Sequence, residues 1–180
     1  KKKRFVYLIK AFRRVVAVHP TAKLIIVGDG EEKRRLKRLI RKSKLSSHVK
    51  LKGHVAHQEL TKLLRRADIF CLPSVTTKDG NQEGIPNSIK EAMATGLPIV
   101  STRHGGIPEL VEHGKEGLLV KERSPARLAE SINRLIESPE LRAEFGRSGR
   151  AKVERRFDAE KQVRRLEGIY KRLLRKRKER

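Results

Sequence analysis

The feature of this sequence that most constrains its fold is the alternation of short apolar runs with longer segments of helical periodicity. Apolar runs of strand length lie at residues 24–27, 49–51, 68–72, 99–101 and 117–120. Helical patterns lie at residues 5–16, 33–42, 58–66, 87–95, 125–137, 140–155 and 159–175. Because strands that alternate with helices form parallel sheets, we predict an α/β fold with a Rossmann-like, doubly wound parallel sheet.

The chain length of 180 residues allows one substantial core, so we predict one domain over residues 1–158, followed by a basic helix and tail at residues 159–180. Cys71 is the only cysteine, which excludes an internal disulfide and favours a reducing, cytoplasmic location. No apolar run approaches the roughly 20 residues that span a bilayer, and no signal-peptide pattern is present. We therefore expect a soluble protein.

The net charge of +24 favours anionic partners without identifying one. Only 4% of the residues are aromatic, which leaves little material for stacking single-stranded nucleic acid, so we expect no specific nucleic-acid partner. The basic helices at residues 33–42 and 161–180 could attach peripherally to the anionic inner face of a membrane. Alternatively, they form a solvated, charged surface.

The loops that follow the predicted strands should converge on one cleft, because ligands of doubly wound sheets bind beyond the carboxyl ends of the strands. After Val27, the turn contains Gly28 and Gly30, which permit a close backbone approach to phosphate. A plain structural turn would have the same two glycines, so this signal is weak.

The loop after Leu72 leads into a helix that begins near Asn87. The free amides of Asn87, Ser88 and Ile89 and the positive end of the helix dipole suit a diphosphate. Pro86 fits just before that first turn, and Asn87 or Ser88 could instead be an ordinary N-cap.

Two carboxylates adjoin this helix start: Glu83 in the loop and Glu91 in the first turns. A carboxylate accepts two hydrogen bonds from a vicinal diol, so Glu91 could hold ribose hydroxyls and Glu83 the hydroxyls of a sugar beyond the phosphates. Separately, each carboxylate would more often be a solvated surface charge.

The run from Glu83 to Val100, EGIPNSIKEAMATGLPIV, and the following STRHGGIPE resemble the donor-site signature of family 4 retaining glycosyltransferases of the GT-B fold. VGDG at residues 27–30, KGHV at residues 52–55 and ADIF at residues 67–70 match flanking patterns of the family, so the resemblance covers nearly the whole chain. DGNQEGIPNS at residues 79–88 is similar to the branch that serves bacterial exopolysaccharide assembly, of the colanic-acid type.

The resemblance implies a donor site for a nucleotide-diphosphate sugar, with a UDP- or GDP-sugar as co-substrate and no other cofactor. Glu83 would contact the donor sugar, Glu91 the ribose, and Lys3 the diphosphate, although Arg4 stands where the family has Gly. Glu83 and Lys3 would be the catalytic residues. The full predicted donor-binding set is Gly28, Gly30, Gly53, His54, Val55, Glu83, Gly84, Ile85, Pro86, Asn87, Ser88 and Glu91. Of these, Gly53, His54 and Val55 would hold the base, and the backbone of Ile85–Ser88 the pyrophosphate.

The resemblance also implies that this chain is one half of a GT-B fold. The family's first strand of this domain would precede residue 1, and the N-terminal acceptor-binding domain would precede that strand. We therefore expect the isolated chain to turn over little substrate. One alternative is a noncatalytic nucleotide-sugar-binding subunit that acts with a separate acceptor-domain chain, and another is a basic nucleic-acid-binding domain.

Several other polar residues suggest no chemistry of their own. His54, His57, His104 and His113 lack the spacing of a metal-ligand set, and no Asp-x-Asp pair is present, so we predict metal independence. Glu109 suits a turn or helix start. Ser74 and Ser101 lack an identifiable neighbouring base, so a nucleophilic triad has no support.

Overall fold

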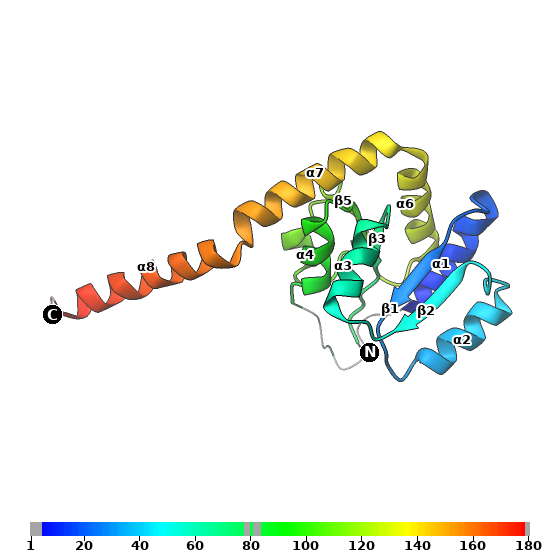
Figure 1. Ribbon diagram of the computed structural model, residues 1–180, viewed down its shortest axis with the longest axis horizontal. Helices are drawn as coiled ribbons and strands as arrows, with labels where there is room; N and C mark the ends of the chain where they lie inside the picture. Colours follow the sequence, from blue (N-terminus) through cyan, green and yellow to red (C-terminus); the bar gives the residue numbers. More distant parts are fainter. Residues whose placement is uncertain (1–4, 78–79, 81–83, 179–180) are drawn as a thin grey trace.

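The fold is described from a computed structural model, which covers residues 5–77, 80 and 84–178. Helices alternate with strands through most of the chain (Figure 1). In chain order the elements are α1 (Phe5–Val18), β1 (Leu24–Val27), α2 (Lys33–Lys42), β2 (Val49–Gly53), α3 (His57–Arg65), β3 (Phe70–Leu72), α4 (Asn87–Ala94), β4 (Ile99–Thr102), α5 (Ile107–Leu110), β5 (Gly117–Val120), α6 (Pro125–Glu137), α7 (Pro139–Arg156) and α8 (Ala159–Lys178).

The strands predicted from the apolar runs are all present, and three of them differ in their boundaries. The strands predicted at residues 49–51 and 99–101 extend to Gly53 and Thr102. The strand predicted at residues 68–72 is confined to Phe70–Leu72. The short helix α5 was not predicted, because four residues are too few to show helical periodicity. Pro108 lies in the first turn of α5, where its missing N–H removes no intrahelical hydrogen bond.

All strand pairs are parallel, as predicted, but they form two separate sheets. One sheet pairs β1 with β2, and the other has the order β3-β4-β5. In a doubly wound sheet, the first strand lies between the second and the fourth. With the family's first strand counted, β1 and β3 are the second and fourth strands. The division between the two sheets therefore falls at the position that this first strand has in a doubly wound sheet.

A cavity of about 1890 Å³ lies along this division. Its lining includes all of β1, all of β3, and apolar side chains of α1 such as Phe5, Leu8 and Phe12. Among the residues that the structure describes, none forms a strand paired with β1 on the side away from β2, or with β3 on the side away from β4. These two strands thus present unpaired backbone edges to a largely apolar space.

Helices cover both faces of the sheets, as the doubly wound prediction requires. One hydrophobic cluster joins α1, α2 and α6 to the sheets through residues such as Val100 and Leu118. The other joins α3, α4 and α5 to the sheets through Ile99 and Leu119, the chain neighbours of those two residues. Neighbouring strand residues point to opposite faces, so β4 and β5 are buried on both sides.

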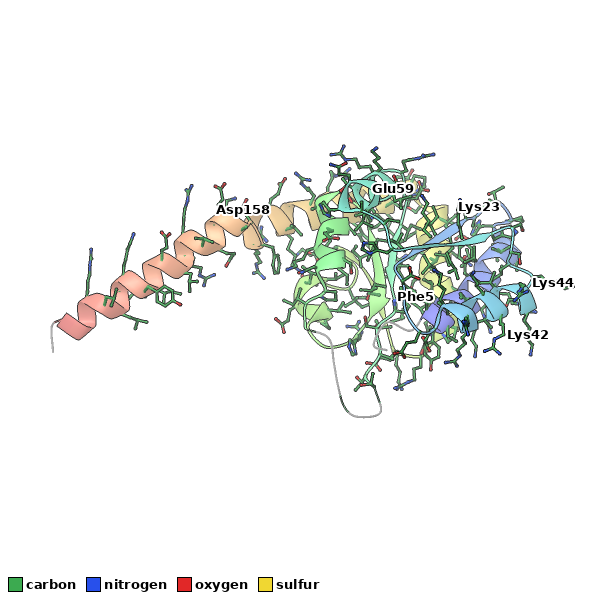
Figure 2. All side chains as sticks on the ribbon, turned by 60° about the horizontal axis from the view of Figure 1, so that its bottom comes forward. Phe5, Lys23, Lys42, Lys44, Glu59 and Asp158 are labelled. Carbon is green, nitrogen blue, oxygen red and sulfur yellow. The ribbon has the colours of Figure 1, made fainter. Side chains whose placement is uncertain are left out.

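The last two helices differ in their packing. Helix α7 lies against α4, where Gly149 contacts Met93. Helix α8 then projects away from the body, and Asp158 marks the junction (Figures 1 and 2). Among its side chains described, none is buried. The division into residues 1–158 and 159–180 remains a prediction. Within the described ranges, no helix is both long and apolar enough to cross a membrane.

Candidate functional site

The loops after β1 and β2 are held together at the carboxyl ends of these strands. The Gly28 amide donates to the Gly53 carbonyl across 2.7 Å, and Gly28 has a φ of +117°, which favours glycine. The structure thus brings Gly28 and Gly53 together as predicted for one site. Gly30 is exposed nearby and lines the cavity, as Gly28 does.

Asp29, between the two glycines, is a residue that the sequence reasoning did not assign a role. Its Oδ1 accepts from Lys33 Nζ at 2.6 Å, and its Oδ2 accepts from the backbone amide of His54 at 3.1 Å. The hydrogen bond from Lys33, followed by that from His54, holds the pKa of Asp29 below its ordinary value. Asp29 therefore fixes the segment predicted to hold the base. The available signal was an acidic residue four positions before a lysine at a helix start.

The start of α4 offers a site for an anion. Its N-cap is Pro86, with φ −68° and ψ 124°, and no side chain caps the helix. The alternative in which Asn87 or Ser88 is an ordinary N-cap is therefore wrong. The hydroxyl Oγ of Ser88 is buried without a hydrogen-bond partner in the described part of the chain. Ser88 also lines the cavity, so this hydroxyl and the helix N-terminus share one location.

Glu91 lies one turn after Asn87 on the same side of α4, three residues from Ser88. It is half-buried, and no ion pair joins it to another described residue. Its carboxylate therefore keeps its capacity to accept hydrogen bonds from a ligand.

Two predicted residues, Lys3 and Glu83, lie outside the described residues. Gly84, next to Glu83, is exposed, and Ile85 is half-buried. Both pack against Gly106, where an added Cβ would lie 2.9 Å from Ile85 Cγ1 and 3.1 Å from the Gly84 carbonyl carbon. Val55 is half-buried beyond β2, but the lining of the cavity does not include it.

The two serines considered above have contacts that belong to the fold. Ser101 Oγ donates to the Leu72 carbonyl at 2.6 Å, which links β4 to β3. The Ser74 amide donates to Thr102 Oγ1 at 3.0 Å, and Thr102 Oγ1 donates to the Ser74 carbonyl at 2.6 Å. These bonds fix the path of the chain where it leaves β3.

The histidines are dispersed. His113 Nδ1 accepts from the Leu119 amide at 3.0 Å, whereas His104 is buried and pairs with Glu122. The described residues contain no group of three or more His, Cys, Asp or Glu side chains placed to hold a metal ion. Glu109 is exposed in the first turn of α5.

The parallel strands, the glycine turns at their carboxyl ends and the helices on both faces define a Rossmann-like domain. Residues 1–152 match the family model for glycosyl transferases group 1. The chain therefore belongs to this glycosyltransferase family, and the resemblance that its motifs predict is confirmed.

Relatives by sequence include proteins of bacterial exopolysaccharide assembly. The amylovoran biosynthesis glycosyltransferase AmsK of Erwinia amylovora is 42% identical over 82% of this chain and 36% of its own length. The putative colanic acid biosynthesis glycosyltransferase WcaL of Escherichia coli is 44% identical over 74% of this chain and 33% of its own length. This chain thus spans about a third of the length of these two relatives.

Similar solved structures include one with a bound nucleotide. The HepE protein of Anabaena in complex with UDP has a TM-score of 0.84 and 29% identity, over 94% of this chain and 45% of that chain. The same protein has also been solved with UDP-glucose, with a TM-score of 0.83. The chain covers less than half of the HepE chain, which agrees with the prediction that it is one half of a GT-B fold.

Proposed function

We propose that this chain binds the nucleotide-diphosphate sugar for a glycosyltransferase that moves a hexose, with retention of configuration, to a saccharide or lipid-linked acceptor. The observation that carries the proposal is the unpaired Ser88 hydroxyl at the start of α4, one turn from Glu91. The structure of HepE with UDP-glucose supports a UDP-sugar, while a relative from Corynebacterium glutamicum, 37% identical, is named as GDP-mannose-dependent. Both donor types therefore belong in the test.

The chemical contribution of this chain is to hold the donor and stabilise the departing diphosphate. The backbone from Ile85 to Ser88 and the helix dipole of α4 accept the pyrophosphate, and Glu91 accepts hydrogen bonds from the ribose. We assign Glu83 to the donor sugar and Lys3 to the diphosphate. Fixed amides and a lysine stabilise the charge that develops as the bond from the sugar C1 to the diphosphate breaks, so the proposed reaction is metal-independent.

The acceptor hydroxyl would be held by a separate N-terminal acceptor domain, so the isolated chain is expected to bind donor and turn over little. The alternative role, a noncatalytic donor-binding subunit, makes a different prediction. Mixing this chain with a separately expressed acceptor domain would restore transfer only if the two act as separate chains.

A peripheral position at the cytoplasmic face of a membrane is part of the proposal for a lipid-linked acceptor. Helix α8 has an exposed apolar stripe opposite a basic face, as helices that lie in a membrane interface do. The stripe consists of Val163, Leu166, Ile169, Tyr170, Leu173 and Leu174. Sedimentation with phosphatidylglycerol vesicles, but not with phosphatidylcholine vesicles, would support this position, and loss of sedimentation in Leu173→Ser would assign it to α8.

The donor-site proposal is tested by calorimetric titration with UDP-, GDP- and ADP-sugars. We expect saturable binding of one of them by the wild-type chain. Glu91→Ala should weaken it about tenfold or more, because a hydrogen bond to a charged group contributes about 1.5–3 kcal/mol. Glu144→Ala removes an exposed carboxylate on α7 and is the matched control, with no change expected. Equal affinity of the wild type and Glu91→Ala would contradict the role of Glu91.

A further inference from the structure

A hydrogen bond between a buried histidine and a partly buried glutamate lies at the carboxyl ends of β4 and β5, and none of the roles assigned above uses it. His104 Nδ1 lies 2.7 Å from Glu122 Oε1, and the exposed fractions of the two side chains are 0% and 17%. This distance places the proton on Nδ1, which donates to the carboxylate. Burying a charge costs free energy unless it is paired, so the pair calls for a structural or functional explanation.

The carboxylate of Glu122 also accepts hydrogen bonds from Thr76, which lies in the segment that follows β3. The Thr76 amide donates to Glu122 Oε2 at 3.0 Å, and the Thr76 hydroxyl donates to Oε1 at 3.0 Å. Arg123, next to Glu122, donates from Nη2 to the Thr76 carbonyl at 2.7 Å. The backbone donor and acceptor of Thr76 are therefore both bound. We call Thr76, His104, Glu122 and Arg123 the Thr76 anchor.

The loop that contains His104 also contacts the chain eight residues after Thr76. Gly106 lies against Gly84 and Ile85, with no space for a Cβ. One short loop between β4 and α5 therefore contacts Thr76 on one side and Gly84 on the other. Ile85 leads through Pro86 into the N-terminus of α4, where the diphosphate would bind.

The ionisation of Glu122 fits this role. Burial raises the pKa of Glu122, but the hydrogen bonds from His104 and Thr76 outweigh burial and hold the pKa below its ordinary value. The carboxylate is thus charged at neutral pH and accepts all of its hydrogen bonds at once.

We propose that Glu122 is a positioning residue which, through the Thr76 anchor and Gly106, fixes Thr76, Gly84 and Ile85 and so sets the affinity for the diphosphate-sugar part of the donor. This inference rests on the proposed function. Fixing Thr76 on one side and Gly84 and Ile85 on the other in the free protein lowers the conformational entropy that is lost when the ligand binds. The ribose and base contacts, at Glu91 and at residues 53–55, do not involve the anchor.

The test compares two ligands in each variant: the nucleotide-diphosphate sugar that the wild type binds, and the matching nucleoside monophosphate. We expect Glu122→Ala to reduce the preference for the diphosphate sugar at least tenfold, with the monophosphate affinity changed less than twofold. Glu122→Gln keeps one acceptor oxygen and should lose less. Glu112→Ala is the matched control, because Glu112 forms an exposed ion pair with Lys115 before β5 begins.

Two further measurements keep the result decisive. Thr76→Val removes the hydroxyl bond to Glu122 and the 3.5 Å contact of that hydroxyl with His104 Nδ1, but it keeps both backbone bonds of Thr76. It should therefore fold and show a smaller loss of the same preference. Hydrogen exchange should show faster exchange of the Thr76 amide in Glu122→Ala but not in Glu112→Ala.

The positioning role of Glu122 would be overturned if a folded Glu122→Ala bound both ligands equally more weakly, or if its preference for the diphosphate sugar were unchanged. Absence of binding by the wild type would instead overturn the proposed function, and with it the ligand part of the inference. In that case, if the Thr76 amide also exchanged at the same rate in Glu122→Ala as in the wild type, the Thr76 anchor itself would be overturned.

Discussion

The two sheets of this domain have similar sequences but different surroundings. In the three-stranded sheet, every residue of β4 is buried, and side-chain hydrogen bonds link β4 to β3 and to the chain just after β3. In the two-stranded sheet, β1 has the wholly apolar sequence Leu-Ile-Ile-Val, yet only Ile26 is buried and Ile25 is 47% exposed. The difference is one of neighbours, because β1 faces the cavity where β4 has strands on both sides.

An apolar run therefore indicates how deeply a strand is suited to be buried, and not how deeply its neighbours bury it. A continuous apolar strand is typical of a parallel sheet covered on both faces. For β4 the described residues supply all of that cover, and for β1 they supply only part. We therefore expect substitutions in the three-stranded sheet to cost more stability than similar ones in the two-stranded sheet.

The largest expected loss of stability comes from breaking the ion pair that supports β5. Lys152 on α7 donates to Glu116 at 3.2 Å, and their side chains are only 10% and 4% exposed. Lys152→Ala would leave the Glu116 carboxylate buried without a counter-charge, with the Glu112 amide as its remaining donor, so we expect urea unfolding to show a loss of about 3–5 kcal/mol. Lys115→Ala, which breaks the exposed pair with Glu112, should cost less than about 1 kcal/mol. Similar losses in the two variants would contradict the assigned role of burial.

The most direct test of the comparison is the same substitution in both sheets. Ile99→Ala in β4 removes a fully buried side chain, so we expect a loss of about 2–5 kcal/mol in the free energy of unfolding. Ile25→Ala in β1 should cost about half as much or less, because water already reaches that side chain. If the two losses were equal, the two-stranded sheet would be as tightly packed as the three-stranded one.

Much of the fold could be predicted from the sequence because the strands and helices differ in period. The runs before Gly28 and Pro73 marked β1 and β3, and the residues from Asn87 to Ala94 marked α4. The division of the sheet could not be derived from periodicity, because strand order depends on contacts between distant segments. It was anticipated only through the family resemblance.

The donor-binding role of the site residues stays a prediction, but part of their arrangement was predictable from the motifs. Gly28, Gly53 and Ser88 were expected at one cleft. The structure places Gly28 in contact with Gly53, and Gly28 and Ser88 both line the cavity, whereas Gly53 does not. Asp29 and Glu122 were not predicted, because their partners His54 and Thr76 are 25 and 46 residues away. Isolated charged residues in a chain with 37% charged residues give no signal of such pairings.

The smallest expected effect on stability comes from the thiol of Cys71. It tests how well the boundary between the two sheets is shielded from water. It lies in β3 and lines the cavity, and burial raises the pKa of its thiol from 9.0 to about 12. Above pH 9 the unfolded chain releases this proton while the folded chain retains it, so stability should fall as the pH rises from 9 towards 12. At pH 10 the loss attributable to Cys71 should be about 1.4 kcal/mol.

Cys71→Ala isolates this contribution, because it removes the thiol and leaves the lysines that titrate in the same range. The wild type should therefore lose more stability than Cys71→Ala between pH 8 and pH 10 in parallel urea unfolding experiments. The alkylation rate of the folded wild type at pH 8 should also be far below that of the unfolded chain, because the thiolate is the reactive form. Equal pH dependence of the two proteins would mean that water in the cavity solvates the thiolate, and the exposed edge of β3 would then resemble β1 more than β4.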